Sequence, residues 1–413
     1  MSMGCSDRPG LMPLADGLAH LLERLVPLSG AGSVALADSV GRITAASIRA
    51  EAPVPAWDNS AMDGYALRRA DLLADKPLPI QGRSLAGQPY TEPLKPGYCV
   101  RVMTGAVLPA GCDAVVMQEE AEVSDRGVTF EKVPEQGNNI RRAGEDCRAG
   151  DRLLPEGHCI RPQDVALLAS VGCAEVSVRP RLKVGLLATG DELRQPDETL
   201  GVGDLYDSNR PALHALLARL GVQVNDYGVV ADDPDALRQV LQQADTECDL
   251  VITSGGVSVG EADYTRQVLG ELGDIEIWKL AIKPGKPLAF GRLSNSWFIG
   301  LPGNPVSSLV TFHLVATRAI RQLQGQPDKA LPSLRATTTE AIRKTPGRMD
   351  FQRGVWRQTE TGVEVRPTRA QQASHILGSL TEANCYIALE QDRGSVAAGE
   401  TVTLWLFDAL FSS

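Results

Sequence analysis

The residues best suited to chemistry lie in three glycine-containing turns, each of which follows an apolar run of the sequence. The turns are "TGDEL" from Thr189, "TSGGVSVGEAD" from Thr253 and "GLPGNPVSS" from Gly300. Glycine lets backbone N–H groups approach an anion closely, and a helix N-terminus adds oriented donors. One such turn could be purely structural, but three at equivalent places predict a site for a phosphate-type ligand. The candidate binding residues in these turns are Thr189, Gly190, Asp191, Ser254, Gly255, Gly256, Val257, Ser258, Pro302, Gly303, Asn304 and Pro305.

Positive charge near these turns comes from the segment "WKLAIKPGKP", residues 278–287. On a single strand Lys279 and Lys283 share one face, because side chains alternate along a strand. Gly285 then turns the chain, so that Lys286 can point to the same edge. The alternative is an exposed edge strand protected by lysines, but the neighbouring glycine and prolines favour anion binding.

Three acidic residues, Glu192, Asp232 and Asp263, fall near the carboxyl ends of expected strands. Carboxylates repel a phosphate unless a divalent cation lies between them. Mg²⁺ is suited to this role, because it is held by one or two carboxylates together with ligand phosphates. Either Asp232 or Asp233 could cap a helix that starts at Pro234; we expect Asp233 to be the cap and Asp232 to face the site.

A second group of polar residues lies far upstream, in a segment rich in proline and glycine. "DNSAMDGYA" contains Asp63, "MTGA" contains Thr104, and "NIRRAGED" contains Arg141 and Asp146. Taken alone, the first motif is compatible with an Asx turn and the last with a solvated salt-bridge surface. These motifs by themselves therefore assign no function.

The elements that position the three turns alternate along residues 181–330. "LKVGLLA", "VQVNDYGVV", "DLVITSGG" and "WFIGLPGNP" predict strands, and "IEIWKLAIKPG" and "PLAFGRL" each predict one further strand. Helical patterns lie between them; the one at "SNRPALHALLARLG" has Ser208 as its expected N-cap, and the last one has Asn304. Such alternation is typical of a doubly wound, mostly parallel α/β domain, whose ligands bind beyond the carboxyl ends of the strands. The turns therefore converge on one edge of the sheet.

The rest of the chain has different patterns. Residues 49–144 combine short β-type runs with many prolines and glycines, which predicts a β-rich inserted domain. Residues 331–413 give short strands between turn residues, which predicts a small C-terminal β-barrel. Helical patterns occur at residues 11–28 and 161–172. The fold class is therefore multidomain, α/β plus β.

The composition narrows the function classes. The 413 residues are 43% hydrophobic and 22% charged, as in soluble globular proteins. The formal net charge of −10 argues against general binding to nucleic acid or membranes. The eight cysteines form no C-x-x-C pair, which argues against structural zinc and iron–sulfur sites. Without a long apolar run or a signal-peptide layout, the chain is expected to be cytoplasmic.

Taken together, the motifs resemble those of the MoeA family, the molybdopterin molybdenumtransferases. The shared motifs include "DNSAMDGYA", "NIRRAGED", "SGGVSVGEADYT", "KLAIKPGKP", "GLPGNPVS" and "TPGRMDFQRG", in the family's order. The resemblance implies insertion of molybdate into adenylyl-molybdopterin with Mg²⁺, release of AMP and formation of molybdenum cofactor. It also implies four domains, the first a split linker and dimerisation domain formed by residues 10–48 and 145–180, and the α/β domain as the molybdopterin-binding domain. It further implies a homodimer whose site combines both subunits and possible contact with other cofactor-biosynthesis proteins.

The resemblance also implies roles for individual residues. The family's functional residues match Asp63, Asp146, Glu192, Asp232, Asp263, Lys279, Lys283, Arg353 and Ser374, with Glu192, Asp232 and Asp263 as metal candidates. Thr104, Arg141, Pro302 and Pro305 match further positions. The sequence departs from the family pattern at "ASHI", where a glycine often precedes the serine, and at "VPAW".

Two alternatives stay open on the sequence. The α/β segment also resembles stand-alone molybdopterin adenylyltransferases, and relatives in animals serve as scaffold proteins, so a non-catalytic binding protein of the same fold is conceivable. The inserted domain and the barrel favour the insertion step, and the complete set of charged motifs favours catalysis.

Overall fold

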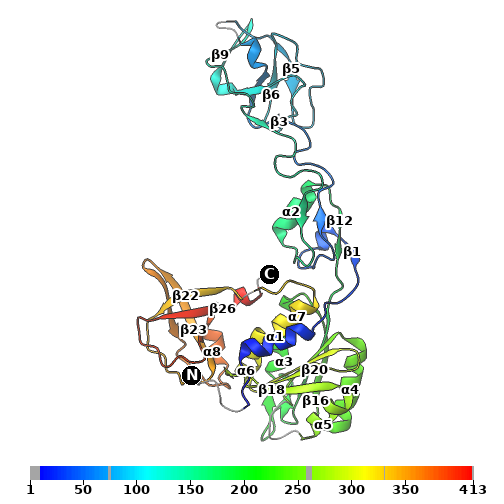
Figure 1. Ribbon diagram of the computed structural model, residues 1–413, viewed down its shortest axis with the longest axis vertical. Coiled ribbons are helices and arrows are strands. Elements are labelled where there is room, and N and C mark those ends of the chain that lie inside the picture. Colours follow the sequence, from blue (N-terminus) through cyan, green and yellow to red (C-terminus); the bar gives the residue numbers. More distant parts are fainter. Residues whose placement is uncertain (1–9, 73–75, 257–262, 330, 412–413) are drawn as a thin grey trace, which may run out of the picture.

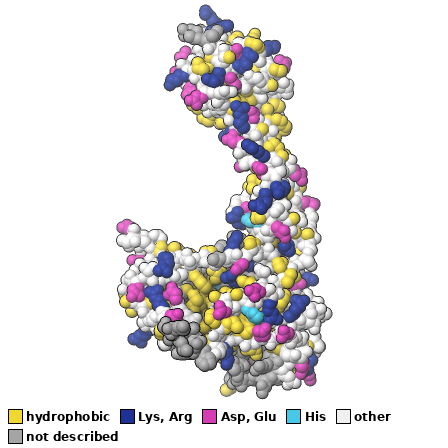
Figure 2. All heavy atoms as spheres, viewed as in Figure 1, with side chains coloured by type: hydrophobic (Ala, Val, Ile, Leu, Met, Phe, Trp, Pro, Cys, Tyr) yellow, Lys and Arg dark blue, Asp and Glu magenta, His cyan; other side chains and the backbone are white. Residues whose placement is uncertain are grey.

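The computed structural model describes residues 10–72, 76–256, 263–329 and 331–411. The molecule is elongated (Figure 1): an α/β sheet and a barrel lie side by side at one end, and a stalk leads from them to a separate β-rich unit. Figure 2 shows how narrow the connection to this distal unit is when all side chains are drawn. Within the described residues, no helix has both the length and the apolar character needed to cross a membrane.

Six strands form the central sheet, in the order β16-β13-β17-β21-β20-β18. The first four are parallel, and the last two are antiparallel to their neighbours. The bounds are β13 (Lys183–Thr189), β16 (Gln223–Val230), β17 (Leu250–Ser254), β18 (Asp274–Lys279), β20 (Pro287–Arg292) and β21 (Trp297–Leu301). The predicted mostly parallel α/β sheet is confirmed.

Helices cover both faces of this sheet, because its strands are apolar on both sides. Successive residues point to opposite faces, so that Leu186 packs in one hydrophobic cluster and Leu187 in the other. The first cluster includes the buried sides of α1, α3, α6 and α7, and the second those of α4 and α5. The bounds are α1 (Leu14–Arg24), α3 (Asn209–Arg219), α4 (Pro234–Glu247), α5 (Asp263–Leu272), α6 (Pro305–Thr311) and α7 (Thr317–Leu323).

The C-terminal strands close into the predicted barrel. β23 pairs with both β24 and β25, and β22 and β26 complete the ring. The bounds are β22 (Ser333–Thr338), β23 (Met349–Thr359), β24 (Gly362–Pro367), β25 (Cys385–Leu389) and β26 (Thr401–Leu406), with α8 (Gly378–Glu382) and a short η5 (Asp408–Phe411) beside them. A closed barrel leaves none of these five strands with an unpaired edge.

The lysine segment is not the single strand that the sequence predicts. β18 ends at Lys279, and a separate strand, β19 (Ile282–Lys283), pairs with β23 of the barrel. Pro284 follows at once, and proline cannot donate to a strand ladder. The chain therefore leaves one sheet and joins another within three residues, which separates Lys279 from Lys283.

A buried histidine joins the α/β part to the barrel. His313 lies in η4 (Phe312–Ala316), a π-helical segment between α6 and α7, and its Nδ1 is 2.8 Å from the hydroxyl of Tyr386 on β25. Burial, with a smaller contribution from Arg219, lowers the pKa of His313 to about 3. The imidazole is therefore neutral at ordinary pH.

Acid is expected to weaken this junction. An unfolded histidine titrates near pH 6.5, so the stability that His313 contributes is fully present above that pH and is lost as the pH falls towards 3. Between pH 6.5 and pH 5 the loss is about 2 kcal/mol. Urea unfolding at both pH values should show a smaller difference for His313→Gln than for the wild type. The exposed His214→Gln serves as the control, and an unchanged difference in His313→Gln would contradict this assignment.

The stalk and the distal unit are built from the N-terminal part of the chain. In the stalk, β1 (Gly32–Ala35) pairs with β12 (Glu175–Val178) and β2 (Ile48–Arg49) with β11 (Arg152–Leu154), beside η1 (Leu36–Asp38) and α2 (Pro162–Ser170). The distal unit contains the sheet β5-β6-β4-β7 and the pairs β3/β10 and β8/β9. Its bounds are β3 (Asn59–Ser60), β4 (Gly64–Leu67), η2 (Arg69–Asp71), β5 (Ile80–Ser84), β6 (Cys99–Val102), β7 (Ala114–Met117), η3 (Gln118–Glu120), β8 (Ala121–Ser124), β9 (Gly127–Phe130) and β10 (Ile140–Arg141). Segments from both sides of the distal unit thus meet in the stalk.

Candidate active site

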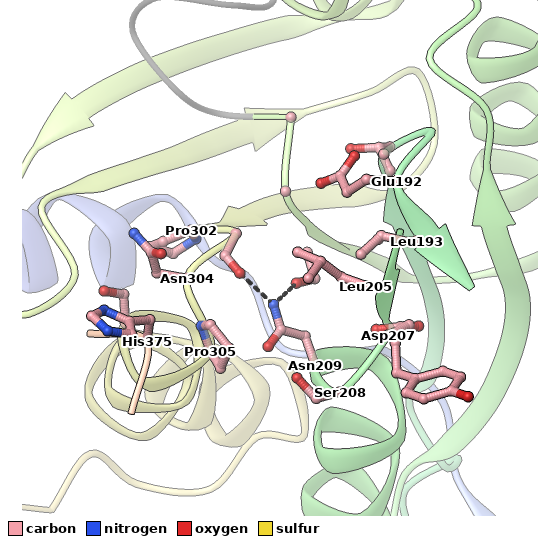
Figure 3. Close-up of a pocket in the computed structure, with 18 of the residues that line it drawn as sticks. Glu192, Leu193, Leu205, Asp207, Ser208, Asn209, Pro302, Asn304, Pro305 and His375 are labelled. Carbon is pink, nitrogen blue, oxygen red and sulfur yellow. Dashed lines mark hydrogen bonds between the residues drawn. The ribbon is translucent and has the colours of Figure 1, made fainter. Parts of the chain in front are cut away.

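A cavity of about 700 Å³ borders the carboxyl edge of the central sheet (Figure 3). The loops after β13, β17 and β21 all contribute to its wall, as expected for a sheet of this type. The predicted binding residues that line it are Thr189, Gly190, Ser254, Gly255, Gly256, Pro302, Gly303, Asn304 and Pro305. Val257 and Ser258 lie outside the described residues.

The glycines of the second turn are required by close packing against the first turn. Gly255 and Gly256 have φ angles of +93° and +70°, a region that favours glycine. A Cβ on Gly255 would lie 2.9 Å from the carbonyl oxygen of Thr189, and one on Gly256 would lie 3.0 Å from its Oγ1. Two strand-end loops can therefore meet in the cavity wall only because these side chains are absent.

Asn209 joins the second and third turns, although no motif in the sequence predicted this role. Its Nδ2 donates to Ser254 Oγ at 2.8 Å and to the carbonyl oxygen of Gly303 at 2.7 Å (Figure 3). Its Oδ1 is buried and has no hydrogen-bond partner among the described residues. The only sequence signal was its place at the start of a helix that follows a strand end.

The wall beside Asn209 is fixed by a buried ion pair. Asp207 and Arg210 are 3% and 8% exposed, and Arg210 Nε donates to Asp207 Oδ2 at 2.9 Å. The backbone N–H of Arg210 donates to Asp207 Oδ1 at 3.1 Å, while Ser208 makes no side-chain capping bond. Asp207, rather than the predicted Ser208, therefore caps α3. Asn304 likewise occupies the N-cap position of α6 without a side-chain capping bond.

The acidic residues lie on the sheet side of the cavity. Glu192 and Asp232 both line it and are both exposed. Asp233 caps α4 by accepting from the N–H of Ala236 at 2.8 Å, as predicted. Asp191 does not line this cavity; its Oδ1 accepts from the N–H of Asp232 at 2.9 Å and so orients the loop. Asp263 begins α5, and its side chain lies outside what the structure describes.

The lysines do not line the cavity, although Lys279 ends a strand at the same edge of the central sheet. Lys279 pairs in register with Pro287 at the start of β20, and Pro287 lines the cavity. Two strands separate β17 from β18, so Lys279 is about 14 Å from Ser254 along the edge. Lys283 Nζ lies 3.5 Å from Asp350 Oδ2 in the barrel. Lys279, Lys283 and Lys286 are all exposed.

The barrel contributes one loop to the cavity. His375, which was not among the residues predicted from the sequence, lines it. The carbonyl oxygen of the adjacent Ser374 accepts from the N–H of Val306 at 3.0 Å. Arg353 is 1% exposed and donates to Ser379 Oγ at 3.0 Å and to the carbonyl oxygen of Ala373 at 3.3 Å. Arg353 thus fixes the loop that carries Ser374, whereas its own guanidinium is buried.

Of the remaining predicted residues, Asp63, Thr104 and Arg141 lie in the distal unit, whereas Asp146 lies between β10 and β11, where its N–H donates to the carbonyl oxygen of Val54. Asp63 Oδ1 accepts from Thr104 N at 2.7 Å and from Thr104 Oγ1 at 2.8 Å, and these bonds lower the pKa of Asp63. Arg141 and Asp146 are exposed. Figure 1 shows this unit at the far end of the stalk from the central sheet. A single chain therefore keeps the distal unit, which carries Asp63, away from the cavity.

Comparison with known proteins covers nearly all of these units. The MoeA N-terminal region (domain I and II) matches residues 12–172, a probable molybdopterin binding domain matches residues 185–322, and the MoeA C-terminal region (domain IV) matches residues 335–407. The molybdopterin molybdenumtransferase of Haemophilus influenzae is 45% identical over 97% of this chain and 100% of its own. The chain belongs to the molybdopterin molybdenumtransferase family.

Other members support this placement along the whole chain. A molybdopterin molybdenumtransferase 2 of Mycobacterium tuberculosis is 34% identical over 94% of this chain and 97% of its own. The crystal structure of the molybdopterin biosynthesis moeA protein from Pyrococcus horikoshii OT3 matches with a TM-score of 0.83 at 29% identity, over 96% of this chain and 100% of that one. The chain is therefore an enzyme of the transferase class.

The side chains of this transferase allow a test of whether Mg²⁺ fits. Among the described residues, no three His, Cys, Asp or Glu side chains form a metal site of their own. Glu192 and Asp232 nevertheless share the cavity wall. Mg²⁺ is commonly held by one or two carboxylates together with substrate phosphates. The donor set thus fits an ion that is shared with a phosphate ligand, rather than one held by protein alone.

Proposed function

We propose that this chain inserts molybdenum from molybdate into adenylyl-molybdopterin in a Mg²⁺-dependent reaction that releases AMP and forms molybdenum cofactor. The observation that carries the proposal is the cavity of about 700 Å³, in which backbone-lined turns meet two carboxylates at the carboxyl edge of the sheet. Its volume is in the range of sites that enclose drug-sized ligands. Membership of the molybdopterin molybdenumtransferase family supports this choice of reaction.

In this proposal the phosphates of the substrate lie over the turns. Gly255, Gly256 and Gly303 present bare backbone there, and Asn209 holds their loops together. Glu192 and Asp232 would hold Mg²⁺, with Asp263 as the third candidate. Bound Mg²⁺ would draw charge from the phosphoanhydride and so make it easier to break.

We further propose that molybdate binds where the sheet edge meets the barrel. Lys279 and Lys283 are exposed there, and Ser374 is carried by the barrel loop. These groups can donate charge-assisted hydrogen bonds to an oxyanion. Because Arg353 is buried, we assign it first to holding this loop; its contact with molybdate stays a prediction that needs the loop to shift.

The proposal also requires a homodimer. The distal unit, which carries Asp63 between β3 and β4, lies at the far end of the stalk from the central sheet (Figure 1), so Asp63 can complete a site only in a second subunit. We propose the same for Asp146. The hydrogen bonds from Thr104 lower the pKa of Asp63, so it would act as an anion that orients water or takes up a proton. The four-domain division and a cytoplasmic location remain predictions of the same proposal.

Turnover of defined substrates tests the proposal against its alternatives. The full chain, given adenylyl-molybdopterin, molybdate and Mg²⁺, should release AMP, and omission of either ion should stop the release. A molybdopterin adenylyltransferase would instead use ATP and molybdopterin without the adenylylated intermediate. A scaffold protein would turn over neither set, so either of these two results would overturn the proposal.

A further inference from the structure

The cavity wall is short of positive charge for a site that takes anionic ligands. Its described lining contains three carboxylates, those of Glu192, Asp207 and Asp232, but no lysine or arginine. Asp207 is already paired with Arg210 behind the wall. Among the described lining residues, His375 is the only side chain that can become a cation.

His375 lies on the opposite side of the cavity from the acids. Figure 3 shows it beside Asn304 and Pro305, across from Glu192 and Asp207. The hydrogen bond from Val306 N to the carbonyl oxygen of Ser374 holds the loop of His375 against this side. The cavity thus has an acidic pole on the sheet and an imidazole pole on the barrel.

Hydrogen bonds with Arg353 hold the loop that carries His375 in place. Gln372 Oε1 accepts from Arg353 N at 2.8 Å, and Gln372 Nε2 donates to the carbonyl oxygen of Arg353 at 3.0 Å. The Arg353 guanidinium adds its bond to Ala373. His375 itself is exposed, and no hydrogen bond to its ring is present among the described residues. The backbone of His375 is thus fixed while its ring is available to a ligand, which favours a binding role over a structural one.

We propose that protonated His375 binds a tetrahedral oxyanion at the barrel side of the cavity, which makes anion affinity depend on pH. This inference deepens the proposed function and rests on it, because the oxyanion would be either molybdate or the phosphate of the nucleotide. A protonated imidazole donates from both ring nitrogens, and hydrogen bonds to charged groups are the stronger ones. Histidine side chains change charge between about pH 8 and pH 5.

The charges around the cavity favour binding of an anion on the side of the barrel. Glu192 and Asp232 repel an oxyanion from their own pole when no cation is shared with them, and they attract a protonated imidazole across the cavity. Further cations among the described residues lie outside the lining: Arg353 next to the loop of His375, Lys286 next to Pro287, and the exposed Lys279 and Lys283. The comparison between the wild type and His375→Gln separates the contribution of the histidine from that of these cations.

Binding of molybdate alone and of AMP alone to the full chain tests the inference at pH 6 and pH 8. For the ligand bound by His375, wild-type affinity should be roughly tenfold higher at pH 6, the size expected for one hydrogen bond to a charged group. His375→Gln should lose this gain, and His375→Lys should keep the higher affinity at pH 8. His214→Gln, an exposed histidine outside the cavity, should behave as the wild type.

The two ligands distinguish the sources of the oxyanion. The AMP phosphate titrates near pH 6 itself, so in that arm the quantity compared is the difference between wild type and His375→Gln. An effect with molybdate assigns His375 to the metal oxyanion, and an effect with AMP alone assigns it to the phosphate. Binding without any difference between wild type and His375→Gln would overturn the inference and leave the proposed function intact. Failure of the wild type to bind either ligand would overturn both.

Discussion

Replacing Asp63 by Asn is expected to lower AMP release from adenylyl-molybdopterin and molybdate by at least about 100-fold, the usual size of an acid–base or water-orienting contribution. Asn keeps the shape of the side chain and its bonds to Thr104, so the loss would come from the missing charge. Single-turnover measurement of AMP is the assay. Glu122→Gln, an exposed acid on β8 of the same unit, is the control and should retain full activity. Normal release by Asp63→Asn would remove this residue from the mechanism.

The same variant can locate the site across two subunits. Glu192→Gln alters the cavity wall, whereas Asp63→Asn alters the distal unit at the other end of the molecule (Figure 1). If each site combines one wall with the distal unit of the other subunit, a mixed dimer of these variants contains one fully native site. Mixed and re-equilibrated subunits should then recover about a quarter of wild-type activity. No recovery would contradict the shared site while leaving the Asp63 result in place.

Loss of Arg210 is expected to be the largest single effect on stability. Arg210→Met leaves Asp207 buried without its partner, and breaking a buried ion pair in this way costs about 3–5 kcal/mol of the free energy of unfolding. Arg210 Nη1 also donates to Asp226 Oδ2 at 2.5 Å, and its Nη2 donates to Gln195 Oε1 at 2.9 Å. The substitution therefore removes several hydrogen bonds that stabilise the cavity wall. Urea unfolding measures the loss, and AMP binding should weaken in parallel.

Two comparisons make this prediction specific. Arg357→Met breaks an exposed ion pair with Glu364 on the barrel and should cost less than about 1 kcal/mol. The double variant Arg210→Met/Asp207→Leu removes both buried charges and should be more stable than Arg210→Met alone. A cost below 1 kcal/mol for Arg210→Met, or no recovery in the double variant, would show that burial of the unpaired carboxylate is not the cause.

The central sheet could be predicted because its information is local. Strands such as "LKVGLLA" are continuously apolar, and the helices between them are amphipathic, so the order of elements and the edge reached by the turns follow from spacing alone. The same reasoning placed Asp233 as the cap of α4, because proline follows it. It failed at Ser208, where Asp207 reaches the same N–H group from one residue earlier.

The lysine segment shows where local patterns stop being sufficient. Alternation predicted one strand that places Lys279 and Lys283 on one face. The chain instead divides between two sheets, because β19 finds a partner in β23, more than sixty residues further along. Whether residues 282–283 pair with the central sheet or with the barrel depends on the partner strands. The spacing of residues within 278–287 therefore cannot predict this pairing.

The sequence by itself determined the fold class, the family motifs and the three turns that share one sheet edge, since each depends on residues close together in the chain. Only the tertiary structure selected Asn209, Asp207 with Arg210, and His375 as parts of the cavity wall. It also placed the distal unit, which carries Asp63, at the far end of the stalk from the central sheet (Figure 1). These contacts arise from packing between segments that are far apart in the sequence. Burial and shape decide which of their side chains meet, and the hydrophobic periodicity of one segment does not predict such contacts.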